Sequence, residues 1–125
     1  MIIPKVVRVG SVFYEVKTQD TPIVMNGAQC LGYCDFFNHI IMLDESMQDE
    51  QTMEQTFCHE LVHALMFERK INLEAMGLSK AQMENVVDNL GIALHQVLLD
   101  NADMALTVEE FNAKYPPQEP EVKEE

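Results

Sequence analysis

The sequence has no tryptophan and only eight lysines and arginines against 21 aspartates and glutamates, which gives a formal net charge of −13. The shortage of basic residues argues against a nucleic-acid-binding protein, because phosphate contacts need lysine and arginine. It argues equally against an anionic membrane surface as a partner. We therefore expect any partner to be a neutral or basic protein or peptide, with no nucleic acid and no membrane.

The cysteines are also few. Three is an odd number, which excludes a complete disulfide framework within one chain. Cys30 and Cys34 are separated by three residues, and Cys58 directly precedes a histidine. This spacing differs from the C-x-x-C pairs typical of cysteine-rich zinc sites, and there is no second pair. We interpret all three as small core thiols in a reducing compartment.

Long hydrophobic runs are absent: no apolar stretch approaches the ~18 residues of a membrane-spanning helix. The first residues, Met1-Ile2-Ile3-Pro4-Lys5, do not have the pattern of a signal peptide, so we expect a cytoplasmic protein. The 125 residues, 47% of them hydrophobic, fit one domain with one modest core. We place this domain at residues 1–115 and an acidic, disordered tail at 116–125.

The first third of the sequence has the pattern of a β-sheet. Segments rich in β-branched and aromatic residues predict strands at 6–9, 12–16, 31–35 and 39–43. Gly10-Ser11 favours a turn between the first two strands. Asp20-Thr21-Pro22 and Asn26-Gly27 indicate loops.

The rest of the sequence has the signals of helices. We predict three of them, at about 49–70, at about 80–100 and a short one that ends near 115. Ser46 or Asp49 is a candidate cap for the first, and the pairs Ser79 with Gln82 and Thr107 with Glu110 have capping-box spacing. Strands followed by helices predict an α+β fold, with helices packed on one face of a small, mainly antiparallel sheet.

The most informative segment, His59-Glu60-Leu61-Val62-His63, has the pattern H-E-x-x-H within the first predicted helix. Residues four apart lie on one helix face, so both imidazoles can reach one ion. Glu60 can then lie beside the metal-bound water without being a ligand. Two nitrogen ligands and a general base are typical of zinc peptidases, in which Zn²⁺ lowers the pKa of bound water to about 7. The alternative without a metal site is an amphipathic helix with two surface histidines and a surface glutamate.

A catalytic zinc site usually has three protein ligands and one open position. A third histidine in the extended motif is excluded, because Arg69 occupies its position. Glu74, Glu84 and Asp88 remain as candidates. The apolar stripe of the second predicted helix comprises Val86, Val87, Leu90, Leu94, Val97 and Leu98. Glu84 borders this stripe and is the favoured ligand, whereas Asp88 lies about 40° further toward the polar side and could orient a ligand histidine.

Four other residues are weaker candidates. His39 could stabilise an oxyanion if its strand borders the cleft, although such histidines are more often partly buried sheet residues. His95 lies on the helix face of Glu84, but about 16 Å away by helix rise, which is too far to share an ion. Tyr33 and Tyr115 are candidate donors to a transition state.

These segments together resemble a compact zincin. The resemblance is to the small metallopeptidase-like proteins of bacteriophages and prophages, which are related in plan to the ImmA/IrrE metallopeptidases. The segments that carry it are 31–35, 40–44, 56–65, 84–90 and 98–101. The resemblance implies a zincin-like fold, Zn²⁺ as cofactor, His59 and His63 as ligands, Glu60 as base and an acidic third ligand, which we map onto Glu84.

Two functions are therefore expected from the sequence. The first is a zinc metallopeptidase that hydrolyses a protein or peptide substrate, which residues 31–35 could hold as an added β-strand. The alternative is a non-catalytic zincin-like module that binds a phage or host regulatory protein. Hydrolysis that disappears in Glu60→Gln distinguishes the two, whereas metal content alone does not.

Overall fold

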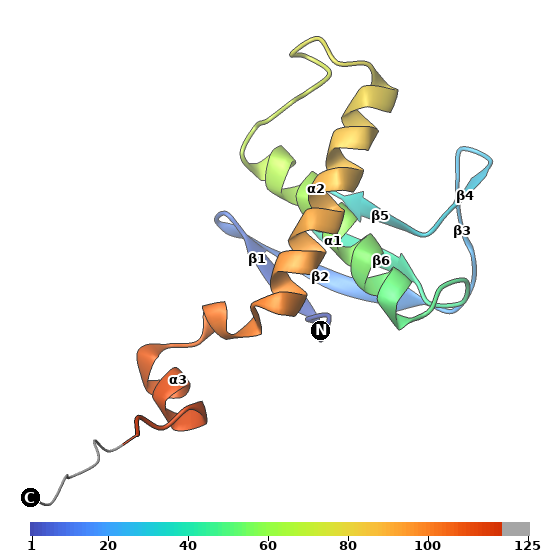
Figure 1. Ribbon diagram of the computed structural model, residues 1–125. Helices are drawn as coiled ribbons and strands as arrows, with labels where there is room; N and C mark the ends of the chain where they lie inside the picture. The colour runs from blue at the N-terminus through green and yellow to red at the C-terminus, as the bar shows by residue number, and fades with distance from the viewer. Residues whose placement is uncertain (119–125) are drawn as a thin grey trace, which may run out of the picture.

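The computed structural model describes residues 1–118 and has an α+β architecture (Figure 1). Its main sheet has the strand order β1-β2-β6-β5. These strands span Val6–Val9 (β1), Val12–Gln19 (β2), Gly32–Asp35 (β5) and Ile40–Asp44 (β6). The outer pairings are antiparallel, but β2 and β6 are parallel, so the sheet is mixed. The chain passes from β2 to the edge strand β5, and the β5–β6 hairpin then places β6 between them. Because β5 runs opposite to β2, β6 runs parallel to β2.

A second, two-stranded sheet lies between β2 and β5 in the sequence. It pairs β3 (Ile23–Met25) with β4 (Ala28–Cys30), two strands that the sequence did not predict, on either side of the predicted loop at Asn26-Gly27. Asn26 and Gly27 both have positive φ, 53° and 77°, as a two-residue hairpin turn requires. The strands themselves were missed because they are short and carry little buried apolar surface; Val24 is 65% exposed.

The predicted helices are confirmed, with small differences at their ends. They are α1 (Glu50–Glu68), α2 (Lys80–Asp100) and α3 (Val108–Lys114), with a 3₁₀ turn, η1, at Ala102–Ala105. Asp49, rather than Ser46, caps α1 by accepting a hydrogen bond from the Thr52 amide. The capping box that begins α2 is present in full, and Thr107 caps α3.

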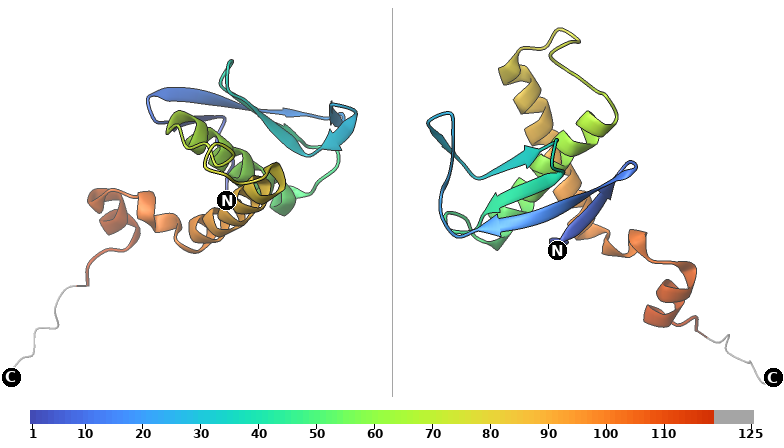
Figure 2. Two further views of the ribbon diagram at one scale, coloured as in Figure 1. Left: turned by 90° about the horizontal axis from the view of Figure 1, so that it is seen from above. Right: turned by 180° about the vertical axis from the view of Figure 1, so that it is seen from behind.

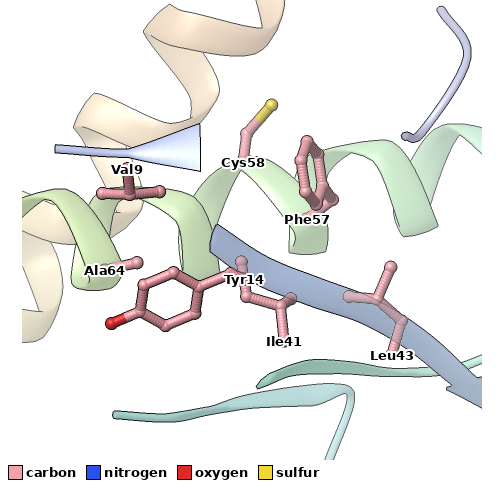
Figure 3. Close-up of a cluster of buried hydrophobic side chains, with 7 residues drawn as sticks. All are labelled: Val9, Tyr14, Ile41, Leu43, Phe57, Cys58 and Ala64. Carbon is pink, nitrogen blue, oxygen red and sulfur yellow. The ribbon is translucent and has the colours of Figure 1, made fainter. Parts of the chain in front are cut away.

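The elements are stacked so that α1 lies between the sheet and α2 (Figures 1 and 2). The buried core between α1 and the sheet comprises Val9, Tyr14, Ile41, Leu43, Phe57, Cys58 and Ala64 (Figure 3). The Tyr14 hydroxyl donates a hydrogen bond of 2.7 Å to Glu68 Oε1, which joins β2 to the last turn of α1. All three cysteines are free: Cys58 is fully buried in the core, Cys34 is partly buried and packs against it, and Cys30 is half-buried, so the prediction of core thiols is confirmed for Cys58 and in part for Cys34.

Helices α1 and α2 lie in close contact at Gly91. A Cβ atom on this glycine would lie 3.0 Å from both the Cα and the amide nitrogen of His59. Main-chain atoms of a helix cannot move aside as a side chain can. The absence of a side chain at Gly91 therefore sets the distance between the two helices at the position of His59.

The contact face of α2 agrees with the predicted apolar stripe at Val87 and at Leu94, which packs against the core, and differs from it elsewhere. Its buried residues are Val87, Gly91 and His95. Leu90 and Leu98 of the predicted stripe are 48% and 40% exposed. The reason is that Gly91, which has no side chain, faces the main chain of α1 at His59. The neighbouring Leu90 therefore points away from α1.

His95 is buried because it has a charged partner. Its Nε2 atom lies 3.2 Å from Oε1 of Glu54, a buried carboxylate on α1. This polar pair joins α1 to the second half of α2. It confirms that His95 does not share an ion with Glu84.

The C-terminal part of the described chain, η1 and α3, extends away from the body of the molecule (Figure 1). It is held together by Asp103, whose carboxylate accepts hydrogen bonds from Lys114 and Tyr115. The predicted disordered tail falls largely on residues 119–125, outside the described residues. Within residues 1–118, no helix is both long and apolar enough to cross a membrane.

We expect Gly91→Val to lower the free energy of unfolding by roughly 1–3 kcal/mol, because overpacking costs more than valine gains over glycine in helix propensity. Urea denaturation with a chelator present measures this loss. Asn89→Val, at an exposed position of the same helix, is the control and should change stability by less than about 0.5 kcal/mol. Equal losses in the two variants would contradict the close approach at Gly91.

Candidate metal centre

His59 and His63 lie one turn apart on α1 and line a cleft of about 780 Å³. Their ring centroids are 5.1 Å apart, with 67° between the ring planes. The side chains are only 23% and 19% exposed. They are therefore not the freely solvated surface histidines of the alternative interpretation, although both reach the cleft.

Glu84 approaches both imidazoles from α2. Its Oε2 atom is 3.4 Å from Nε2 of His59, and its Oε1 atom is 3.3 Å from Nε2 of His63. One ligating atom from each of the three residues lies within 4.8 Å of the other two. This group could hold a metal ion, and it is the set that the sequence favoured.

The spacing of Glu84 from the two imidazoles is compatible with a tetrahedral ion, although each contact uses a different oxygen of its carboxylate. With ligands about 2.0–2.1 Å from zinc, neighbouring donor atoms of a tetrahedron are roughly 3.3–3.4 Å apart. Both contacts of Glu84 have this length. Imidazole nitrogen and carboxylate oxygen are ordinary zinc ligands, and a cation would also offset the negative charge of Glu84 beside a second acidic residue, Glu60.

Asp88 lies on the other side of the His59 ring. Its Oδ1 atom is 3.5 Å from Nδ1 of His59, whereas Glu84 faces Nε2. A carboxylate behind a ligand histidine fixes the ring orientation and the tautomer. Asp88 is thus placed to orient His59 and not to complete the group of three.

Glu60 is buried, lines the same cleft and is not a member of that group. Burial raises the pKa of Glu60 to about 7, and the negative charge of Glu84 adds to the increase. Burial also lowers the pKa of His63, which outweighs the opposite effect of Glu84 and favours the neutral imidazole that binds metals. A carboxyl group with a pKa near 7 can both accept and return a proton at neutral pH.

The edge strand β5 forms the opposite wall of the cleft. A Cβ atom on Gly32 would lie 2.8 Å from Cγ2 of Thr56, 2.9 Å from the carbonyl oxygen of Met42 and 3.5 Å from Cγ of Glu60. This glycine therefore allows β5 to lie directly against α1 beside Glu60. Tyr33 of the same strand also lines the cleft, as its candidate role would require.

Cys30 and Cys34 line the cleft as well. Burial raises the pKa of both thiols, that of Cys34 to about 12. Neither belongs to the group of potential metal ligands found among residues 1–118.

The structure does not bring the other candidates into this group. His39 lies in the β5–β6 turn with φ of 54°, and its ring packs edge-on against Tyr14 at 5.2 Å. The Tyr115 hydroxyl donates a hydrogen bond to Asp103, and Tyr115 does not line the cleft. Glu74 lines a neighbouring pocket and not the metal centre.

The sequence reasoning missed the two glycines that position the centre. Gly91 allows α2 to lie close to His59, and Gly32 allows β5 to lie close to Thr56 of α1, one turn before Glu60. One signal was available for Gly91: a glycine inside a helix costs about 1 kcal/mol relative to alanine, which points to a packing reason. No comparable signal distinguishes Gly32 from an ordinary turn residue.

Comparison of the chain with family models, with curated proteins and with solved structures gives no match. The metal centre is therefore argued from its own residues.

We expect Glu84→Ala to weaken zinc binding by more than 100-fold, because one of three ligands is lost. Asp88→Ala removes only the residue that orients His59, so its loss should be about 10- to 100-fold. Competition titrations with a zinc chelator give both values. Glu74→Ala is the matched control and should leave the affinity unchanged. A larger loss in Asp88→Ala than in Glu84→Ala would reverse the two assignments.

Proposed function

We propose that this chain is a zinc-dependent metallopeptidase of the compact zincin type, related in plan to the ImmA/IrrE metallopeptidases. One observation carries the proposal. Three potential ligands, His59, His63 and Glu84, meet in an open cleft beside Glu60, a buried carboxylate that is not one of them. Structural zinc sites are usually closed by four protein ligands, whereas catalytic sites keep a position open for water and substrate.

Each residue has a distinct task in this proposal. Zinc held by His59, His63 and Glu84 would supply Lewis-acid chemistry, which polarises a peptide carbonyl and lowers the pKa of a water molecule to about 7. Glu60 accepts a proton from the attacking water and then delivers it to the amine that leaves. Asp88 holds the His59 ring with Nε2 toward Glu84.

The edge strand supports a peptide as the substrate. β5 is the last strand of the main sheet, and residues Gly32, Tyr33 and Cys34 line the cleft. An unpaired strand edge can bind an extended chain by main-chain hydrogen bonds. A peptide bound in this way runs past Glu60, because Gly32 brings the strand against that part of α1.

A non-catalytic zincin-like module would use the same cleft and could bind the same metal. It has no need for a buried carboxyl group beside the ligands, because burial of such a group costs free energy and the group is not a ligand. The buried Glu60 therefore favours the peptidase.

We expect Glu60→Gln to retain about one zinc per chain and the native fold, and to lower hydrolysis by about 100- to 10,000-fold, the range for loss of a general base. Elemental analysis measures the zinc, and a mixed library of fluorogenic peptides measures the hydrolysis. Glu50→Gln, the same change at an exposed position of α1, is the control and should retain full activity.

Two outcomes would contradict the proposal. If the zinc-loaded wild-type protein cleaves no peptide in the library, the binding module is the better description. If Glu60→Gln loses its zinc, Glu60 is a ligand and not the base.

A further inference from the structure

A second pocket, of about 520 Å³, opens beside the metal centre. It is lined by the end of α1, by the loop that connects α1 to α2 and by Met83 of α2. Its apolar lining comprises Phe36, Met66, Phe67, Ile71, Leu73 and Met83. We refer to it below as the side pocket. Nothing in the proposed chemistry uses it.

The side pocket adjoins the cleft of the metal centre. His63, a potential metal ligand, and Phe36, which follows β5, line both cavities. A peptide that lies along β5, with a carbonyl group at His63, therefore has a neighbouring side chain at the mouth of the side pocket. The pocket is placed to bind part of the same chain whose peptide bond is at the centre.

The walls of the side pocket are well defined. The rings of Phe36 and Phe67 stack with centroids 4.4 Å apart and an interplanar angle of 12°. The Ile71 amide donates to the Met66 carbonyl at 2.8 Å. The Leu73 carbonyl accepts from the amides of Met76 and Leu78, each at 3.1 Å. These bonds fix the loop residues that form the pocket, so it exists before a substrate binds.

The chemistry of the lining selects the kind of side chain. Apolar and aromatic walls stabilise apolar surface, and methionines adapt to residues of different shape. Glu68, Glu74 and Lys70 also line this pocket, and the cleft contributes Glu60, Glu84 and Asp88. Together with a net charge of −13, these carboxylates disfavour an acidic peptide.

We infer that the side pocket binds a bulky apolar side chain of the substrate, such as leucine, methionine or phenylalanine, next to the bond that is cleaved. The substrate class is then a neutral or basic protein segment with such a residue at this position. The inference rests on the proposed function.

Fluorescein-labelled decapeptides of serine, threonine and lysine test the inference. They differ only in one central residue, which is alanine, leucine, phenylalanine or aspartate. Fluorescence anisotropy measures their binding to zinc-loaded Glu60→Gln protein, in which turnover is suppressed. We expect the leucine and phenylalanine peptides to bind about 10- to 100-fold more tightly than the alanine peptide, and the aspartate peptide to bind most weakly.

Two substitutions in the lining, each with a matched control, assign this preference to the side pocket. Leu73→Glu places a charge in the pocket, and Met83→Trp fills it. Both should reduce the preference for phenylalanine over alanine to less than about threefold. Leu99→Glu and Met104→Trp make the same types of change at positions 47% and 72% exposed, outside both cavities, and should retain it. Circular dichroism verifies the fold, and Met83→Trp tests the inference if Leu73→Glu does not fold.

Failure of this inference can be distinguished from failure of the proposed function. The side-pocket inference is overturned, and the proposed peptidase function is supported, in either of two cases. In the first, the wild-type protein hydrolyses peptides without a preference for an apolar residue. In the second, it hydrolyses peptides and both lining variants retain the preference. A preference in binding that the lining variants abolish, without hydrolysis of any peptide by wild-type protein, would support the side pocket and reject the peptidase.

Discussion

The metal centre depends on the close approach of α2 to α1 at Gly91. His59 and His63 need only the periodicity of one helix, but Glu84 comes from another helix and must be brought to them. At Gly91 a hypothetical Cβ atom would lie 3.0 Å from the main chain of His59. Glu84 lies two turns earlier on α2, where its oxygens are 3.3 and 3.4 Å from the two imidazoles. A larger residue at position 91 would separate the helices and would also move Glu84 away from the histidines.

Electrostatics at the centre favours a bound cation. Glu60 is buried and Glu84 is half-exposed. Burial raises the pKa of Glu60 to about 7, and the negative charge of Glu84 adds to the increase. A divalent ion between His59, His63 and Glu84 would offset this repulsion, and it would stabilise the folded protein by an amount that grows with the logarithm of its affinity. The same arrangement that could hold a metal ion thus keeps a buried carboxyl group with a raised pKa beside it.

The part of the site that depends on local sequence could be predicted, and the part that depends on packing could not. His59 and His63 follow from helix periodicity, and the helix caps follow from short-range spacing. Glu84 was favoured for its place beside an apolar stripe, although Leu90 of that stripe is exposed and Gly91 makes the contact. The parallel pairing of β2 with β6 joins strands that are distant in the sequence, and hydrophobic alternation carries no information about strand direction.

X-ray absorption spectroscopy at the zinc edge tests the central claim, the composition of the metal centre, most directly. The account predicts a first shell of nitrogen and oxygen at about 2.0–2.1 Å, with the outer-shell scattering of two imidazole rings. Replacement of Glu84 by alanine should remove one protein oxygen and leave both rings. A sulfur shell at about 2.3 Å, which would place Cys30 or Cys34 on the metal, or the signal of a single imidazole would contradict the account.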